Sequence, residues 1–141
     1  MTTYYVDTNV LLRWLLDDDP ALTAQARSYL QKAKDGEWQL VLISQIVFEL
    51  DYVMRKVYGL PREETAHNLE LILKSTYMEI PDRSELLSAI EWYRKSTIDL
   101  ADCFLFAMAQ SKKAEVLSFD GDIKKLQRGS GMKESEEISA P

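Results

Sequence analysis

Histidine and cysteine are almost absent from this chain of 141 residues, which holds one of each, His67 and Cys103. A single cysteine cannot form an internal disulfide, so we expect a protein of a reducing compartment, the cytoplasm. A single histidine argues against histidine-rich zinc sites and against Ser-His-Asp catalysis. No basic segment precedes an apolar run at the N-terminus, so we expect neither a signal peptide nor a membrane span.

Positive charge is also scarce, because 17 lysines and arginines face 23 acidic residues and the net charge is -6. Proteins that hold duplex DNA through many phosphate contacts are usually basic, which argues against a stand-alone DNA binder. A nuclease remains possible, because metal ions can supply the positive charge that meets the phosphate. The length and the ordinary hydrophobic fraction of 46% predict one globular domain.

Short apolar runs alternate with helical patterns along the chain. We expect a buried strand at 3–6, further strands at 40–43, 77–80 and 116–119, and helices at 7–16, 20–34, 45–58, 61–74, 82–95, 97–110 and 122–127. Asp19 and Ser44 suit helix N-caps, and Ser96 or Thr97 is expected to begin the strongly apolar helix. This alternation indicates a mostly parallel sheet covered on both faces. We expect a domain of residues 1–128 and a loose polar tail at 129–141.

Aspartates follow the first and the last apolar run, at Asp7 and Asp120. Ligands of α/β sheets bind beyond the carboxyl ends of the strands, where these side chains would lie. Each also has a structural interpretation. Asp7 suits the N-cap of the next helix, and Asp120 and Asp122 flank Gly121 in a turn sequence.

Further acids lie within the expected helices. Glu49 is at the edge of an apolar helix face, a position that also suits a solvated residue. Asp99 and Asp102 share one face of a helix that is apolar nearly all round, although the helix dipole alone would favour Asp99. An ionised carboxylate among such neighbours costs several kcal/mol unless it is paired or bound to a metal. Residues 17–19, by contrast, are expected to form a solvated turn and cap.

The spacing of these acids predicts a cluster. One acid follows the first strand, one lies in the helix after the second, one or two begin a buried helix, and one follows the last strand. Two carboxylates about 5 Å apart repel by roughly 3 kcal/mol at an effective dielectric of about 20. Because hard cations take oxygen ligands, such a cluster is typical of a Mg²⁺ or Mn²⁺ site.

Four segments of the chain resemble the PIN domain, and most specifically the VapC-like toxin ribonucleases of type II toxin–antitoxin pairs. They are YVDTNVLLR at 5–13, SQIVFEL at 44–50, LADCFL at 100–105 and LSFDGD at 117–122. The resemblance extends from residue 3 to about residue 127. It implies an α/β fold, a three-layer α/β/α sandwich with a mostly parallel central sheet. The chain departs from the pattern at Ile123, where an aromatic residue often occurs.

The resemblance also implies an activity, metal-dependent hydrolysis of RNA phosphodiester bonds. It assigns the catalytic, metal-binding acids to Asp7, Glu49, Asp102 and Asp120, with Mg²⁺ or Mn²⁺ as cofactor. Asp99 and Asp122 match positions where extra acids occur, and Asn9 and Ser118 match supporting positions. The substrate would be single-stranded or loop RNA. The implied partners are a second copy of the chain and a small antitoxin that blocks the acidic groove, with no membrane involved.

Other functions are weighed against this one. A non-catalytic PIN-like module would dock RNA or a basic peptide in its acidic groove, but such modules usually lose acids that this chain keeps. A phosphatase with an aspartyl intermediate would need a second aspartate where Asn9 stands, and a DNA 5′-nuclease would need more chain. Arg55, Lys56 and Arg62 suit either RNA phosphates or a solvated surface.

Overall fold

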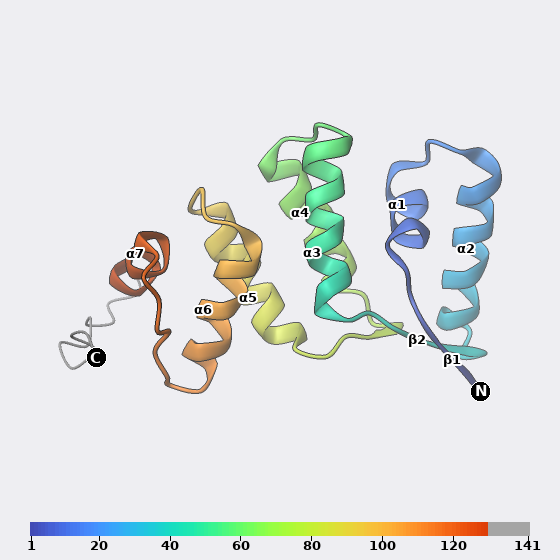
Figure 1. The fold of residues 1–141 in the computed structure, drawn as a ribbon. Coiled ribbons are helices and arrows are strands. Elements are labelled where there is room, and N and C mark those ends of the chain that lie inside the picture. Colours follow the sequence, from blue (N-terminus) through green and yellow to red (C-terminus); the bar gives the residue numbers. More distant parts are fainter. Residues whose placement is uncertain (130–141) are drawn as a thin grey trace. The chain divides into compact units, whose positions relative to one another are not determined.

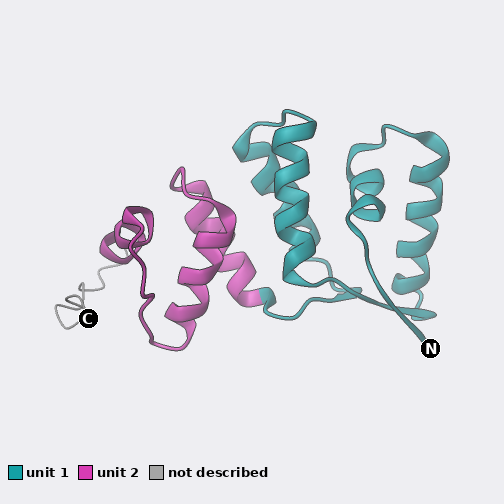
Figure 2. Ribbon diagram, viewed as in Figure 1, with its two compact units in different colours: residues 1–83 teal, residues 84–141 magenta. Residues whose placement is uncertain are grey.

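The structure, a computed structural model, describes residues 1–129. The chain divides into two compact units, residues 1–83 and residues 84–141 (Figure 2), and each unit is described by itself. Residues 130–141, most of the predicted tail, lie outside the described residues. Within residues 1–129, none of the helices combines the length and the apolar character that crossing a bilayer requires.

The first unit contains a parallel sheet of three strands in the order β1-β2-β3. The strands are β1 (Thr2–Tyr5), β2 (Trp38–Val41) and β3 (Met78–Glu79). Thr2 lies opposite Trp38, and Leu40 lies opposite Met78. The predicted burial of the first strand is wrong, because β1 is an edge strand whose four residues are exposed. The buried residue at this point is Val6, directly after the strand.

Helices make up most of the first unit (Figure 1). They are α1 (Thr8–Leu16), α2 (Pro20–Lys34), α3 (Ser44–Tyr52), the π-helical segment η1 (Val53–Val57) and α4 (Arg62–Leu73). Helix α1 packs against α2 and α3, and α3 also packs against α4. Helix α2 begins as predicted, with Pro20 in its first turn and the Asp19 carboxylate accepting the Leu22 N–H at 3.2 Å.

The predicted helix of residues 45–58 differs from the observed one at both ends. Ser44 is the first helical residue rather than the N-cap, and its hydroxyl donates to the Gln45 side chain at 3.3 Å. After Tyr52 the helix widens into η1, where the Tyr58 N–H donates to the Val53 carbonyl. Gly59 then ends the segment with a φ of 68°, a conformation that glycine adopts without strain.

Two polar groups tie the first unit together. The side chain of Asp51, 6% exposed, accepts two hydrogen bonds from the Arg55 guanidinium at 2.9 and 2.8 Å. The guanidinium of Arg83 donates to three backbone carbonyls near β3, those of Leu73, Ser75 and Met78. These bonds satisfy three backbone carbonyls and secure the chain where the first unit ends.

The second unit is helical within the described residues and contains α5 (Arg83–Arg94), α6 (Leu100–Ser111) and α7 (Gly121–Gly129). The prediction that Ser96 or Thr97 begins the apolar helix is wrong. The Ser96 hydroxyl donates to the Trp92 carbonyl at 2.8 Å and so belongs to the end of α5. Asp99 occupies the N-cap position of α6. Helix α6 is also not buried all round, because Leu105 is 49% exposed.

The predicted strand at 116–119 is wrong, because these residues form an irregular segment between α6 and α7. A strand needs a ladder of backbone hydrogen bonds to a neighbouring strand. Here the Val116 N–H donates instead to the Gln127 side chain of α7 at 3.2 Å. Val116 is buried, whereas Leu117 and Phe119 are exposed. The α/β class and the parallel sheet are nevertheless confirmed.

Candidate active site

Asp7 directly follows the first strand and Val6, as the sequence predicts. It is exposed and is the N-cap of α1, with Oδ1 accepting the Thr8 N–H at 2.8 Å. An ionised carboxylate has about four acceptor sites, so capping leaves it able to accept a further ligand. Asn9 is exposed in the first turn of α1 and, with Arg13 and Tyr29, lines a cavity of about 170 Å³.

Glu49 lies in α3 and is exposed, whereas Val47 and Leu50 beside it are buried. The apolar side of α3 therefore packs into the core and Glu49 lies at the surface, as the position of Glu49 at the edge of the apolar face indicates. Asp7 and Glu49 both belong to the first unit.

The other four predicted acids belong to the second unit. Asp102 is half-buried in the first turn of α6. Burial raises the pKa of its carboxyl, and so do the negative charges of Asp120, Asp99 and Asp122, in decreasing order. Both causes disfavour the ionised form. These four residues, the acid cluster, are therefore close enough to one another for Asp102 to experience the other three charges.

The loop before α7 holds Asp120 in a defined position. The Asp120 N–H donates to the Ser118 hydroxyl at 2.9 Å, and the Asp120 carboxylate accepts the Asp122 N–H at 2.8 Å. Positive charge near the acid cluster comes from Lys125, whose Nζ lies 3.9 Å from Asp122 Oδ1. Asp120 therefore belongs to the predicted turn and is also one of the predicted acids.

A divalent cation fits the chemistry of these donors. Within residues 1–129, no three acidic, histidine or cysteine side chains have the arrangement of a metal site. The acid cluster nevertheless offers only carboxylate oxygens, the ligands that Mg²⁺ and Mn²⁺ prefer. A cation beside Asp102 would also relieve the repulsion that raises its pKa.

Phe119 is a residue near the predicted acids that the sequence analysis did not select. Its ring is fully exposed directly before Asp120, and Leu117 is also exposed. An isolated exposed leucine is ordinary, but a fully exposed phenylalanine next to an acid cluster offers a stacking surface.

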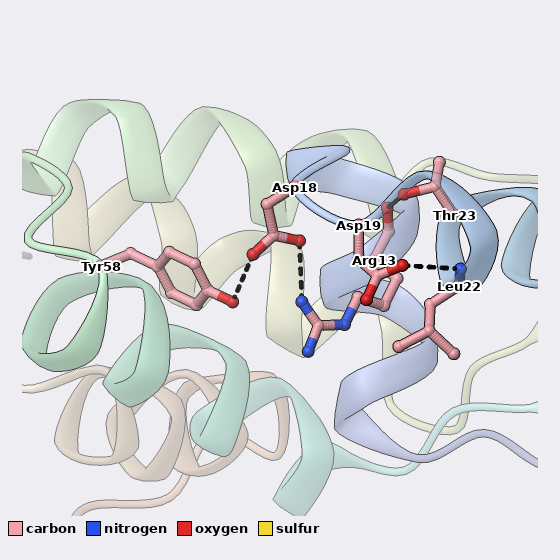
Figure 3. A network of polar contacts seen from close by, with 6 residues as sticks. All are labelled: Arg13, Asp18, Asp19, Leu22, Thr23 and Tyr58. Carbon is pink, nitrogen blue, oxygen red and sulfur yellow. Dashed lines mark hydrogen bonds and ion pairs between the residues drawn. The ribbon is translucent and has the colours of Figure 1, made fainter.

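A second acidic segment, residues 17–19, has a different environment (Figure 3). Asp18 accepts hydrogen bonds from Arg13 Nη1 at 2.8 Å and from the Tyr58 hydroxyl at 3.0 Å. The hydrogen bond from Arg13 is the main cause that lowers the pKa of Asp18. Asp19 caps α2. The prediction of a solvated turn and cap is therefore confirmed, since Asp17 and Asp18 are exposed and Asp19 caps α2, and the acids of this turn have structural partners.

A comparison with protein families identifies the class of this chain. The model of the PIN domain family matches residues 4–129, and the chain belongs to this family. PIN domains are generally nucleases that act on nucleic acids and typically use divalent metal ions. The matched range includes every acid discussed above, and membership confirms the PIN-type α/β fold. A comparison with curated proteins finds no match.

Proposed function

We propose that this protein is a metal-dependent endoribonuclease in which Asp7, Glu49, Asp102 and Asp120 form the catalytic site. The observation that carries the proposal is the environment of Asp102 in a chain of the PIN family, since this residue is half-buried and its pKa is raised by burial and by the charges of three further acids. A fold that only needed stability would not retain a carboxylate whose ionisation is disfavoured in this way.

The four acids would hold Mg²⁺ or Mn²⁺, with Asp99 and Asp122 as further ligands. When bound, such an ion supplies a water of lowered pKa and stabilises negative charge on the phosphate. Asn9 and Ser118 would support the site, and Ser118 already accepts a hydrogen bond from the Asp120 backbone. The chain then needs no nucleophilic side chain, which agrees with its single histidine and single cysteine.

The substrate that we propose is single-stranded or loop RNA. Exposed aromatic rings bind single strands by stacking on their bases, and Phe119 offers such a ring beside Asp120. The acid cluster itself repels phosphates, so RNA should approach it only when a cation is present. Binding and cleavage are therefore both expected to depend on the metal.

We also propose that the protein is the VapC-like toxin of a toxin–antitoxin pair and forms a homodimer. The net charge of -6 suits an antitoxin with a basic segment that enters the acidic groove. Exposed apolar side chains on α3, η1 and α4 support a protein interface in the first unit. They are Tyr52, Val57, Tyr58 and Leu71.

The test is digestion of total RNA by purified protein with Mg²⁺ or Mn²⁺, with EDTA, and with the variant Asp7→Asn. We expect discrete fragments that disappear in EDTA and in the variant. Asparagine caps helices about as well as aspartate, so α1 should stay intact, which circular dichroism checks. Asp17→Asn, also an aspartate of the first unit, is the control and should cleave normally.

Two results would contradict the proposal. Cleavage at the wild-type rate by folded Asp7→Asn protein would rule out the assigned site. Absence of cleavage by folded, partner-free wild-type protein with either metal would favour the alternative, a non-catalytic module that docks RNA or a basic peptide.

A further inference from the structure

The second unit contains a cavity of about 420 Å³ beside the acid cluster. It lies between the end of α5, residues 96–98 and α7, and its walls include Trp92, Lys95, Asp122 and Lys125. This volume is within the range of roughly 300–1,000 Å³ that is typical of sites for small organic ligands. All of the residues that line it belong to the second unit.

The walls of the cavity combine an aromatic ring with positive charge. The indole of Trp92 is half-buried and packs edge-on against Phe106, with 5.4 Å between ring centroids. Lys95 Nζ lies 5.6 Å from the centroid of the Trp92 ring. Lys125 approaches from α7. An ordered ring with one ammonium group near it and a second lysine in the same cavity suits a planar base joined to a phosphate, because the ring stacks and the lysines attract the anion.

Asp122 connects this cavity with the acid cluster. Its side chain lines the cavity, and its charge contributes to the environment of Asp102. An RNA strand with one phosphate at the acid cluster would therefore have a neighbouring nucleotide close to the cavity. The lysines would also offset the repulsion between the strand and the acids.

We propose that the cavity is a subsite for the nucleotide next to the phosphodiester that is cut. The base of this nucleotide would contact Trp92, and its phosphate would contact Lys95 and Lys125. This inference rests on the proposed function, since it requires that RNA reaches the acid cluster. It adds Trp92, Lys95 and Lys125 to the residues that are expected to bind the substrate.

The test measures binding of a fluorescein-labelled RNA of eight nucleotides by fluorescence anisotropy at several salt concentrations. All proteins are full-length and carry Asp7→Asn, so that the RNA stays intact in Mg²⁺. The variant is Lys95→Gln/Lys125→Gln, and the matched control is Lys112→Gln/Lys113→Gln, which removes the same charge from exposed positions outside the cavity.

We expect the slope of log Kobs against log salt to become shallower by about 0.7 in the cavity variant, because the two lysines neutralise one phosphate and each neutralised phosphate of a single strand contributes about 0.7. The control should keep the slope of the parent protein. A second measurement follows the indole N–H signals in ¹H–¹⁵N spectra, with Trp92→Phe used for assignment. RNA should shift the Trp92 signal in the parent protein and not in the cavity variant.

The possible failures are distinguishable. If the parent protein binds RNA but the cavity variant has the same slope and the Trp92 signal does not move, the subsite is wrong and the proposed function stands. If the wild-type protein neither cleaves nor binds RNA, the proposed function fails, and the subsite fails with it.

Discussion

The turn of residues 17–19 and the acid cluster of the second unit both concentrate aspartates, but the protein surrounds them with opposite charges. Asp18 has Arg13 and Tyr58 as hydrogen-bond donors, and the pKa of its carboxyl is lowered, mainly by the bond from Arg13. The pKa of Asp102 is raised, first by burial and then by three carboxylates. Acidity along the sequence is similar in the two regions, whereas the electrostatic environment differs in sign.

This difference separates acids whose ionised form stabilises the folded state from acids whose ionised form destabilises it. An aspartate with an arginine partner favours the folded state when ionised, although an exposed pair contributes little. An aspartate among other aspartates disfavours the folded state unless a cation arrives. Residues of the second kind are candidates for function, because stability alone does not explain them.

The largest expected effect is on the rate of RNA cleavage, where substitutions in the acid cluster and in the turn of residues 17–19 should differ most. Asp102→Asn should lower the RNA cleavage rate by at least about a hundredfold, because a bound metal supplies several kcal/mol of charge stabilisation. Asp18→Asn changes the charge equally but should cleave RNA within about twofold of wild type, since surface substitutions away from a site have small effects. Initial rates on one RNA substrate measure both. Equal rates for the two variants would remove the distinction.

A second prediction extends the comparison to a buried acid that has a partner. Asp51→Ala leaves the Arg55 guanidinium without its bidentate partner in a site where Asp51 is 6% exposed. Breaking such a pair should lower the free energy of unfolding by about 3 kcal/mol. Urea unfolding measures this change. Asp17→Asn, which weakens an exposed contact of 3.5 Å with Arg27 and keeps a side chain that tolerates the φ of 49° at this position, is the control and should cost less than about 1 kcal/mol.

Local signals in the sequence predicted those parts of the fold that depend on neighbouring residues. Asp19 and Pro20 predict the start of α2 because capping and a fixed φ act within one turn. The expected start of α6 was wrong because the Ser96 hydroxyl donates back to the Trp92 carbonyl and accepts the Ile98 N–H, whereas Asp99 occupies the N-cap position of α6. A serine just after one helix can bond back to that helix or cap the next, so its presence alone does not fix where α6 begins.

Features that depend on residues far away in the sequence were harder to predict. An apolar run such as residues 116–119 matches a strand, but a strand also needs a paired neighbour, and the Val116 N–H has the side chain of Gln127 instead. For the site, the sequence predicted the candidate acids and the family, because the motifs and their order can be read directly from the sequence. The raised pKa of Asp102 and the cavity beside Trp92 result from tertiary packing and could not be derived from spacing.

A third prediction concerns the stability of Asp102→Asn in EDTA. Because the pKa of Asp102 is raised in the folded state, its contribution to stability is fully present below the ordinary value of 3.8 and is lost as the pH rises through the folded pKa. Asp102→Asn stays neutral and should melt a few degrees higher than wild type at pH 7, with no difference below about pH 3.8.

Adding Mg²⁺ at pH 7 should raise the melting temperature of wild type above that of Asp102→Asn, since an ion that binds only the folded state stabilises wild type by mass action. Thermal melts followed by circular dichroism give both comparisons. A variant that melts below wild type in EDTA at pH 7 would show that Asp102 has a structural role instead.

The smallest expected effect concerns Asp18→Asn and has the opposite dependence on pH. Because the pKa of Asp18 is lowered, its contribution is present above the ordinary value of 3.8 and is lost as the pH falls through the folded pKa. Wild type should melt slightly above the variant at pH 7, and the gap should close in acid. Salt at 1 M, where screening acts over about 3 Å, should reduce the gap at pH 7. A difference in melting temperature that widened in acid would mean that the bond from Arg13 does not stabilise this turn. The difference between Asp18 and Asp102 would then come from the burial of Asp102 and not from their charged neighbours.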